Sequence, residues 1–302
     1  MIRGKPIHLV LLMLLNTLAC GAATAQFLSQ QDVARLSVAP ADHRIAYGAD
    51  PLQFGDLRLP TGDGPHPVAI VIHGGCWLAA FADLQLMAPM SDALTRAGIA
   101  TWNIEFRSVD SPGGGWPNTL LDVSSAVDYT RELAASYPLD LKRVVIVGHS
   151  AGGHLAQWAA ARHRLTENSP LFRKNPLAVR ATVGLAGIND LQRYLQESAG
   201  CGKSIPRLLG GSPNEVPERY RDASPAEMLP LGIKQALLIG AQDSIVRPQH
   251  NRTYAEAAQK SGDDVHLSVL DNAAHFDVIA PNWVGWPTIE AAVFSMLDGV
   301  KK

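Results

Sequence analysis

A serine lies at the centre of the sequence Gly-His-Ser-Ala-Gly at residues 148–152, directly after the apolar run 144–147. An amphipathic segment begins immediately after this serine, Ser150. Small residues on both sides favour a tight strand-to-helix turn, in which the central residue takes a strained backbone conformation and its hydroxyl stands clear of the sheet. The first amides of the following helix would face the same point, where they favour negative charge. The pattern predicts Ser150 as a nucleophile, against the alternative of a tight turn that merely contains a serine.

A second glycine-rich sequence, HGGCW at residues 73–77, follows the apolar run 68–72. Attack of a serine on an acyl carbon develops an oxyanion, and stabilising that charge requires backbone N–H groups that are already in place. Glycines let the main chain approach a substrate closely. The alternative is an ordinary glycine turn, and His73 is expected to brace the loop rather than to carry a proton. The predicted oxyanion hole comprises Gly74, Gly75, Cys76 and Ala151, with the last three as N–H donors.

An acid and a base that could serve this serine follow two later apolar runs. Asp243 comes after the run 236–239, and His275 comes after the last predicted strand. In this interpretation His275 takes the proton from Ser150, and Asp243 holds the imidazole tautomer and stabilises its charged form. Asp190 also follows a strand and is the competing carboxylate, whereas Asp277 is too close to His275 in sequence. The chain order serine, aspartate, histidine is one in which this triad is known to occur.

Aromatic and histidine side chains near these loops are harder to assign. Tryptophans 77, 116, 283 and 286 lie near them, and either pack in the core or wall a substrate pocket. Trp77 and Trp116 are the predicted substrate-binding residues. We expect the histidines at positions 149, 154, 163, 250 and 266 to occupy turn, helix or surface positions without a role in the reaction. No CxxC, HExxH or paired Cys/His spacing indicates a metal site, and no dinucleotide fingerprint occurs, so we expect neither metal nor cofactor.

Alternating strands and helices must position these residues. Short apolar or β-branched runs predict strands at 43–48, 54–60, 68–73, 99–106, 143–148, 179–187, 234–242 and 265–271. Helical spacing predicts helices at 83–97, 117–136, 152–164, 248–261 and 284–299. This alternation is typical of an α/β fold with a mostly parallel central sheet and helices on both faces. Ligands bind beyond the carboxyl ends of such strands, so the four loops are expected to meet there. Residues 188–230 interrupt this alternation of strands and helices, and we expect them to form a small lid-like excursion.

Composition limits the class of protein. The 302 residues are 47% hydrophobic and 18% charged, with a formal net charge of −2, which is ordinary for a globular chain able to bury a sizeable core. The nearly neutral net charge gives no electrostatic reason to expect nucleic acid as a partner. We expect one domain over residues 26–302 and a small-molecule partner; the oligomeric state is left open.

The N-terminus has the features of an export signal. Arg3 and Lys5 precede an apolar stretch that ends in Ala-Thr-Ala before Gln26, as in a secretory signal peptide cleaved near Ala25. Residues 1–25 are therefore predicted to be removed, which makes the mature protein periplasmic or secreted, without stable insertion in a membrane. The alternatives are an uncleaved membrane anchor or a lipid attached to Cys20. Cys76 and Cys201 would remain and are expected to be two free, mostly buried thiols, although export permits a bond between them.

Together these motifs identify the chain as a member of the α/β-hydrolase superfamily. HGGCW, GHSAGGHLA and AAHFDVI resemble the esterase branch with kynurenine-formamidase-like and acetyl-esterase-like enzymes, over about residues 50–300. The resemblance implies hydrolysis of a carboxylic ester or aryl-formamide through an acyl-enzyme without a cofactor, with Ser150, Asp243 and His275 as nucleophile, acid and base. Hormone-sensitive-lipase-type relatives have a third glycine where this chain has Cys76, which indicates the HGGxW type. The export signal favours a short-acyl esterase; a formamidase, a small peptidase and a non-catalytic binding protein are the alternatives.

Overall fold

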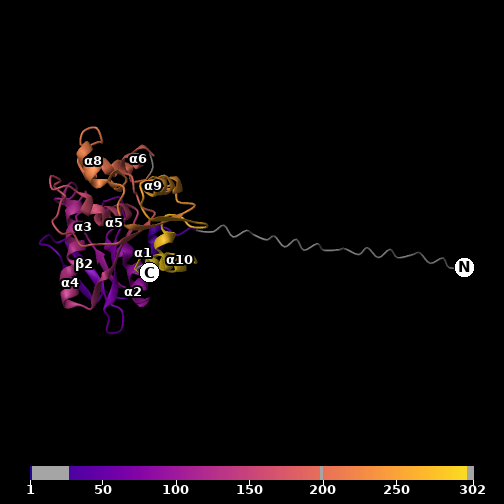
Figure 1. The fold of residues 1–302 in the computed structure, drawn as a ribbon. Coiled ribbons are helices and arrows are strands. Elements are labelled where there is room, and N and C mark those ends of the chain that lie inside the picture. Colours follow the sequence, from indigo (N-terminus) through magenta and orange to yellow (C-terminus); the bar gives the residue numbers. More distant parts are fainter. Residues whose placement is uncertain (2–26, 198–199, 298–302) are drawn as a thin grey trace.

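A single eight-stranded sheet organises the chain (Figure 1). The structure is a computed structural model that describes Met1 and residues 27–197 and 200–297, so the predicted signal peptide lies, apart from Met1, outside the described residues. The strands are β1 (His43–Ala46), β2 (Phe54–Arg58), β3 (His66–Ile72), β4 (Ala100–Ile104), β5 (Leu139–His149), β6 (Ala181–Leu185), β7 (Lys234–Gly240) and β8 (Val265–Leu270). Their order is β1-β2-β4-β3-β5-β6-β7-β8. β1 and β2 pair antiparallel and β2 is antiparallel to β4, while all later pairs are parallel.

Helices and short 3-10 turns connect and cover the strands. The helices are α1 (Gln30–Ala34), α2 (Ala88–Arg96), α3 (Asn118–Asp128), α4 (Thr130–Ser136), α5 (Ala151–Ala161), α6 (Leu191–Gln196), α7 (Ile205–Leu209), α8 (Pro217–Ala223), α9 (Pro248–Lys260) and α10 (Trp286–Leu297). The 3-10 turns are η1 (Leu84–Met87), η2 (Arg162–Arg164), η3 (Gly202–Ser204), η4 (Pro225–Met228) and η5 (Asp277–Ile279). α5 packs on β5 and β6, α9 on β7 and β8, α2 on β4, and α10 on β5, β6 and β7. The predicted α/β fold with a mostly parallel sheet is confirmed.

The central strands are buried on both faces, as their continuous apolar runs indicate. All side chains of 68–72 in β3 and of 145–147 in β5 are fully buried. This pattern is typical of parallel strands covered by helices on both sides. The eight predicted strands are present, with ends shifted by a few residues. No helix in the described part of the chain is long and apolar enough to cross a membrane.

Three predicted helices differ in detail from the structure, and one of them, 152–164, ends as the 3-10 turn η2 after α5. The predicted helix 117–136 is divided into α3 and α4 at Tyr129, and the predicted helix 83–97 begins as the 3-10 turn η1 before α2. The excursion 188–230 contains α6, η3, α7, α8 and η4. In Figure 1, α6 and α8 lie at one end of the molecule beside α9, away from α2 and α4. The excursion therefore lies at the same end of the molecule as α9.

Candidate active site

Ser150 lies on the sharp turn between β5 and α5. Its backbone has φ 55° and ψ −119°, a conformation that residues other than glycine rarely adopt. A Cβ on Gly148 would lie 2.1 Å from the carbonyl oxygen of Gly152, and a Cβ on Gly152 would lie 2.3 Å from that of His73. Both positions therefore require glycine, because backbone atoms fill the space. The N–H of Ser150 donates to the carbonyl oxygen of Leu185 in β6 at 2.8 Å, which holds the turn on the sheet.

His275 and Asp243 form a buried pair on the loops that follow β8 and β7. His275 Nδ1 lies 2.7 Å from Asp243 Oδ2. The other carboxylate oxygen, Oδ1, accepts hydrogen bonds from the N–H groups of Ile245 and Val246, both at 2.8 Å. Asp243 is thus held as an acceptor, so Nδ1 of His275 carries the proton and Nε2 is left free to accept one. Ser150 and His275 line the same cavity.

The competing carboxylate Asp190, and Asp277 near His275, have other partners. Asp190 accepts a hydrogen bond from the N–H of Arg193 at 2.9 Å and caps the first turn of α6. Asp277 accepts from the N–H of Ala274 at 2.8 Å and from the N–H of Leu28 at 3.2 Å. Asp277 therefore holds the loop of His275 against the N-terminal segment, and Asp243 is the carboxylate on the imidazole.

The glycine-rich loop after β3 approaches Ser150 closely. A Cβ on Gly74 would lie 2.9 Å from the carbonyl oxygen of His149 and 3.1 Å from Cβ of Ser150. Gly75 and Cys76 both have positive φ, 96° and 56°, and both line the cavity with Ser150. Their N–H groups donate to no acceptor within residues 27–197 and 200–297. Ala151 opens α5, where the first N–H groups of a helix lack intrahelical partners. The arrangement suits an oxyanion hole.

His73 braces this loop. Its Nδ1 lies 2.8 Å from the carbonyl oxygen of Gly74, and its Nε2 lies 3.0 Å from Oε1 of Glu105. Burial alone lowers the pKa of His73, but the charge and hydrogen bond of Glu105 outweigh burial and raise it. Burial raises the pKa of Glu105, and its pairing with His73 more than offsets this and lowers it. The two groups therefore form a buried ion pair behind the loop.

The cavity beside Ser150 is small and mainly apolar. Its volume is about 180 Å³. It is lined by Gln30, Gly75, Cys76, Phe81, Leu86, His149, Ser150, Cys201, Ile245, His275 and Phe276. These residues come from both ends of the chain and from the excursion. Sequence patterns could not identify the wall residues Gln30, Phe81, Leu86, Ile245 and Phe276, because each belongs to an unremarkable local sequence and meets the others only in the fold.

The prediction that Trp77 binds substrate is wrong. The side chain is fully buried in the core, and its Nε1–H donates to Nδ1 of His154 at 3.2 Å. Trp116 is also absent from the cavity wall; its ring packs under the guanidinium group of Arg219, 5.6 Å from the ring centre. The backbone at Trp77 has positive φ, 58°.

The expectation of two free thiols is also wrong. Cys76 and Cys201 form a disulfide, with Cα atoms 4.9 Å apart and a sequence separation of 125. The excursion places Cys201 directly beside the glycine-rich loop, and both cysteines line the cavity. The bond therefore connects the excursion to the candidate oxyanion hole.

His149 contributes to the site although its sequence context did not indicate a role. Its Nε2 lies 2.9 Å from the carbonyl oxygen of His275, and the two rings lie 4.6 Å apart. Burial, and to a smaller extent repulsion between the two imidazoles when both are charged, holds the pKa of His149 well below its usual value, so the ring is neutral and Nε2 is the donor. Its position immediately before Ser150 placed it near the site, but nothing in the sequence indicated this hydrogen bond. His149 thus holds the backbone of the residue that would act as base.

Comparisons with known proteins find esterases among those that the chain resembles. The sequence model of the BD-FAE family matches residues 56–257. The chain is 29% identical over 248 residues to Esterase LipC of Mycobacterium tuberculosis, covering 78% of this chain and 60% of that protein. It is 24% identical over 245 residues to an isoprenylcysteine alpha-carbonyl methylesterase of Arabidopsis thaliana, covering 78% and 56%. The chain thus spans little more than half the length of these curated relatives.

Solved structures share the fold. A truncated carbohydrate esterase from gut microbiota superposes with a TM-score of 0.71 at 21% identity, covering 85% of this chain and 98% of that one. Esterase B from Lactobacillus rhamnosis, in complex with an inhibitor, gives a TM-score of 0.73 at 19% identity, covering 89% and 91%. At these identities the likeness concerns the fold alone. Both of these neighbours are named esterases.

Proposed function

The chain belongs to the BD-FAE family and has the α/β-hydrolase fold, and from this premise we propose that it is a serine carboxylesterase that cleaves small carboxylic esters. The observation that carries the proposal is that Ser150, on its strained turn, lines the same cavity as His275, whose Nδ1 lies 2.7 Å from Asp243. Relatives named esterase or methylesterase support the same class of reaction.

The proposed reaction proceeds through an acyl-enzyme. Ser150 Oγ attacks the ester carbonyl carbon while Nε2 of His275 takes its proton, and Asp243 stabilises the imidazolium that forms. The oxyanion is stabilised by the N–H groups of Gly75, Cys76 and Ala151. The tetrahedral intermediate collapses, the carbon–oxygen bond to the alcohol breaks, and His275 returns the proton to the leaving alkoxide. Water, activated by His275, then hydrolyses the acyl-serine and regenerates the enzyme.

The cavity favours a short acyl chain. Its volume of about 180 Å³ is well below the 300–1,000 Å³ of pockets that hold drug-sized ligands. The side chains of Leu86, Ile245 and Phe276 supply apolar surface, and no lysine or arginine lines it. A small uncharged acyl group therefore fits better than a long or anionic one.

The protein is proposed to be exported. The apolar N-terminal stretch ending in Ala-Thr-Ala supports this, because it has the features of a cleaved secretory signal. The Cys76–Cys201 disulfide is a second, independent support, since such bonds persist mainly in oxidising compartments.

Hydrolysis of p-nitrophenyl esters of increasing acyl length tests the proposed activity. The mature protein is compared with its Ser150→Ala variant, which keeps the fold and removes the nucleophile. We expect turnover that depends on Ser150 and is highest with acetyl to butyryl chains. A folded protein without Ser150-dependent turnover on any chain length would contradict the esterase assignment, and formamides and blocked peptides would be the next substrates to measure.

A further inference from the structure

The disulfide joins two parts of the proposed active site that are otherwise separate loops. Cys76 follows Gly75 in the candidate oxyanion hole, and its φ of 56° is unusual for a residue with a side chain. Cys201 is buried in the excursion, just before η3. Because the bond fixes the side chain of Cys76, it restricts rotation of the backbone at a residue that lines the cavity.

The hydroxyl of Tyr194 extends this connection to the catalytic acid. It accepts a hydrogen bond from the N–H of Cys201 at 3.3 Å and donates one to the carbonyl oxygen of Ile245 at 2.8 Å. The N–H of Ile245 in turn donates to Asp243 Oδ1 at 2.8 Å. Burial raises the pKa of Tyr194 to about 12, so the hydroxyl keeps its proton and remains a donor. One tyrosine thus bridges the disulfide and the loop of Asp243.

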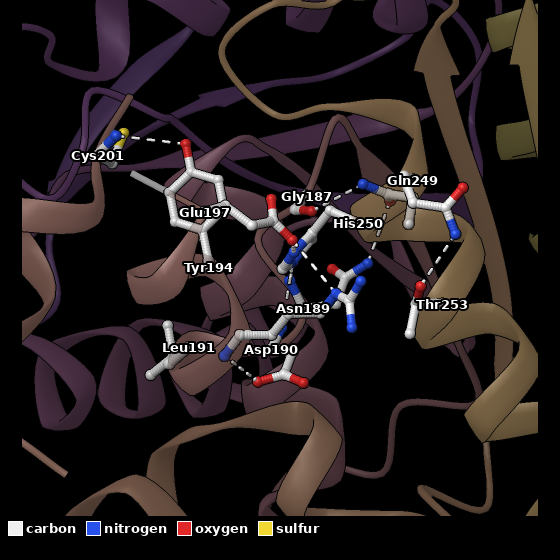
Figure 2. Close-up of polar contacts among 12 residues, drawn as sticks. Gly187, Asn189, Asp190, Leu191, Tyr194, Glu197, Cys201, Gln249, His250 and Thr253 are labelled. Carbon is white, nitrogen blue, oxygen red and sulfur yellow. Dashed lines mark hydrogen bonds and ion pairs between the residues drawn. The ribbon is translucent and has the colours of Figure 1, made fainter. Parts of the chain in front are cut away.

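Tyr194 itself packs against the buried His250 of α9. Figure 2 shows it between Cys201 and the pair formed by Glu197 and His250. Nε2 of His250 accepts a hydrogen bond from the N–H of Asn189 at 3.1 Å, so Nδ1 donates to Glu197 Oε1, also at 3.1 Å. The ring of His250 meets the ring of Tyr194 edge-on at 5.3 Å. α6 is therefore anchored to α9, and the tyrosine hydroxyl has a fixed position.

The fit around the hydroxyl is close. A Cβ on Gly200 would lie 2.4 Å from the hydroxyl oxygen of Tyr194 and 2.9 Å from Cγ2 of Ile245, and Gly200 has φ 50°. The chain next to Cys201 thus passes directly over the tyrosine hydroxyl. Because these atoms are in close contact, a displacement of Cys201 is expected to displace Ile245 as well.

We propose that the Cys76–Cys201 disulfide and Tyr194 form a tether that positions the oxyanion hole and the loop of Asp243, so that ester hydrolysis depends on the oxidised state of this bond. The inference rests on the proposed esterase function. Reduction by a dithiol transfers two electrons and two protons to the disulfide, which becomes two thiols while the dithiol becomes a cyclic disulfide. Cys76 is then free to leave its strained conformation, and its N–H group no longer has a preset direction.

The expected effect is on the chemical step. Oxyanion donors act on charge that develops in the transition state, so their misplacement lowers kcat more than it raises KM. Losing one donor outright costs about 10²–10³ in kcat, and loosening one is expected to cost roughly 10-fold or more. Tyr194→Phe removes the hydroxyl that joins the Cys201 N–H to the Ile245 carbonyl oxygen, and it is expected to lower kcat roughly 3-fold to 10-fold by weakening the position of Asp243.

The test measures kcat and KM for p-nitrophenyl acetate in three states of the mature protein: oxidised, reduced with dithiothreitol, and reoxidised. Thiol titration confirms that the reduced sample has both thiols free. Cys201→Ser keeps Cys76 and removes only the bond, so it is expected to match the reduced protein and to be insensitive to dithiothreitol. Reoxidation of the wild type is expected to restore kcat. Tyr220→Phe is the matched control, because its hydroxyl donates to Gly211 in the same excursion and does not line the cavity.

The outcomes separate this inference from the proposed function. Absence of Ser150-dependent turnover in the oxidised protein contradicts the esterase function itself. Normal kcat in a protein with two titrated thiols, or in Cys201→Ser, overturns the tether while leaving the esterase intact. If Tyr194→Phe lowers only the unfolding temperature, as Tyr220→Phe is expected to, Tyr194 has a structural role and the bridge to Asp243 is wrong.

Discussion

His149 and His275 show how a side chain with no part in proton transfer can still determine the geometry of a base. The neutral imidazole of His149 donates to the carbonyl oxygen of His275 and thereby fixes the backbone of that residue. A neighbouring serine motif is easily recognised in a sequence, whereas this hydrogen bond joins residues 126 positions apart. The role of His149 follows only from the structure.

Replacing His149 tests that role. His149→Leu removes the donor and is expected to lower kcat about 10-fold, since a misplaced base costs transition-state stabilisation. His149→Gln keeps an N–H donor at a similar reach and is expected to restore most of the loss. Steady-state kinetics on p-nitrophenyl acetate and thermal unfolding of both variants make the measurement. Equal kcat in the two variants would show that the hydrogen bond has no part in positioning His275.

His154 is expected to make folding sensitive to mild acid. Burial lowers its pKa to about 4 from the ordinary 6.5, because the charged ring would lose its hydration in the core. The unfolded chain therefore binds a proton between pH 6.5 and 4 that the folded chain does not, and stability present above pH 6.5 is lost as the pH falls toward 4. The loss from this residue alone is about 3 kcal/mol.

Urea unfolding at pH 7 and pH 4 measures this loss in the wild type and in His154→Gln. Glutamine does not titrate, so the difference in unfolding free energy between the two pH values should be smaller in the variant by about 3 kcal/mol. An unchanged difference would mean that His154 is protonated in the folded state or does not contribute.

The turn between β5 and α5 requires glycine at positions where neighbouring backbone atoms leave no room for a side chain. Gly152→Ala would place a Cβ 2.3 Å from the carbonyl oxygen of His73. It would therefore clash with the backbone at the end of strand β3 and in the loop that follows. We expect it to destabilise the fold by roughly 3 kcal/mol or more and to abolish activity. Gly202→Ala is the control, because its Cβ would meet its first neighbour at 3.6 Å, and it should change stability by less than about 1 kcal/mol. Similar unfolding temperatures for both variants would contradict the packing at the turn.

Elements with long, regular patterns were predictable from the sequence, and short ones were not. The runs 68–72 and 145–147 are continuous and apolar because helices cover both faces of their strands, so their pattern carries a clear signal. The helices α6, α7 and α8 have only five to seven residues each, too few for a periodicity to emerge. For this reason the sequence predicted an excursion at 188–230 but not its internal structure.

Contacts between distant segments explain what the sequence could not provide at the active site. Ser150, Asp243 and His275 were predictable because each follows its own strand, and strand ends of a parallel sheet meet. Whether Trp77 turned toward the cavity or the core depended on the backbone of its loop, and the pairing of Cys76 with Cys201 depended on the path of the excursion. Neither the orientation of Trp77 nor the pairing of the cysteines can be read from the local sequence.

The disulfide is also expected to stabilise the molecule as a whole. It closes a loop of 125 residues, and constraints of this length restrict the unfolded chain strongly. Reduction should lower the free energy of unfolding by about 2–5 kcal/mol. Urea unfolding with and without dithiothreitol measures the change, and Cys76→Ser/Cys201→Ser supplies the control that should not respond to the reductant. Equal stability of the oxidised and reduced wild type would contradict the expectation.

Covalent labelling with a fluorophosphonate tests the central claim most directly, because only a serine activated by its neighbours reacts rapidly. The mature protein is labelled, digested and analysed by mass spectrometry, beside Ser150→Ala, His275→Ala, Asp243→Asn and Asp190→Asn. We predict a single phosphonylated site at Ser150, lost in Ser150→Ala and slowed strongly in His275→Ala and Asp243→Asn. Asp190→Asn should label like the wild type, because asparagine also caps α6. A label on another residue, or stronger slowing by Asp190→Asn than by Asp243→Asn, would contradict the assigned triad.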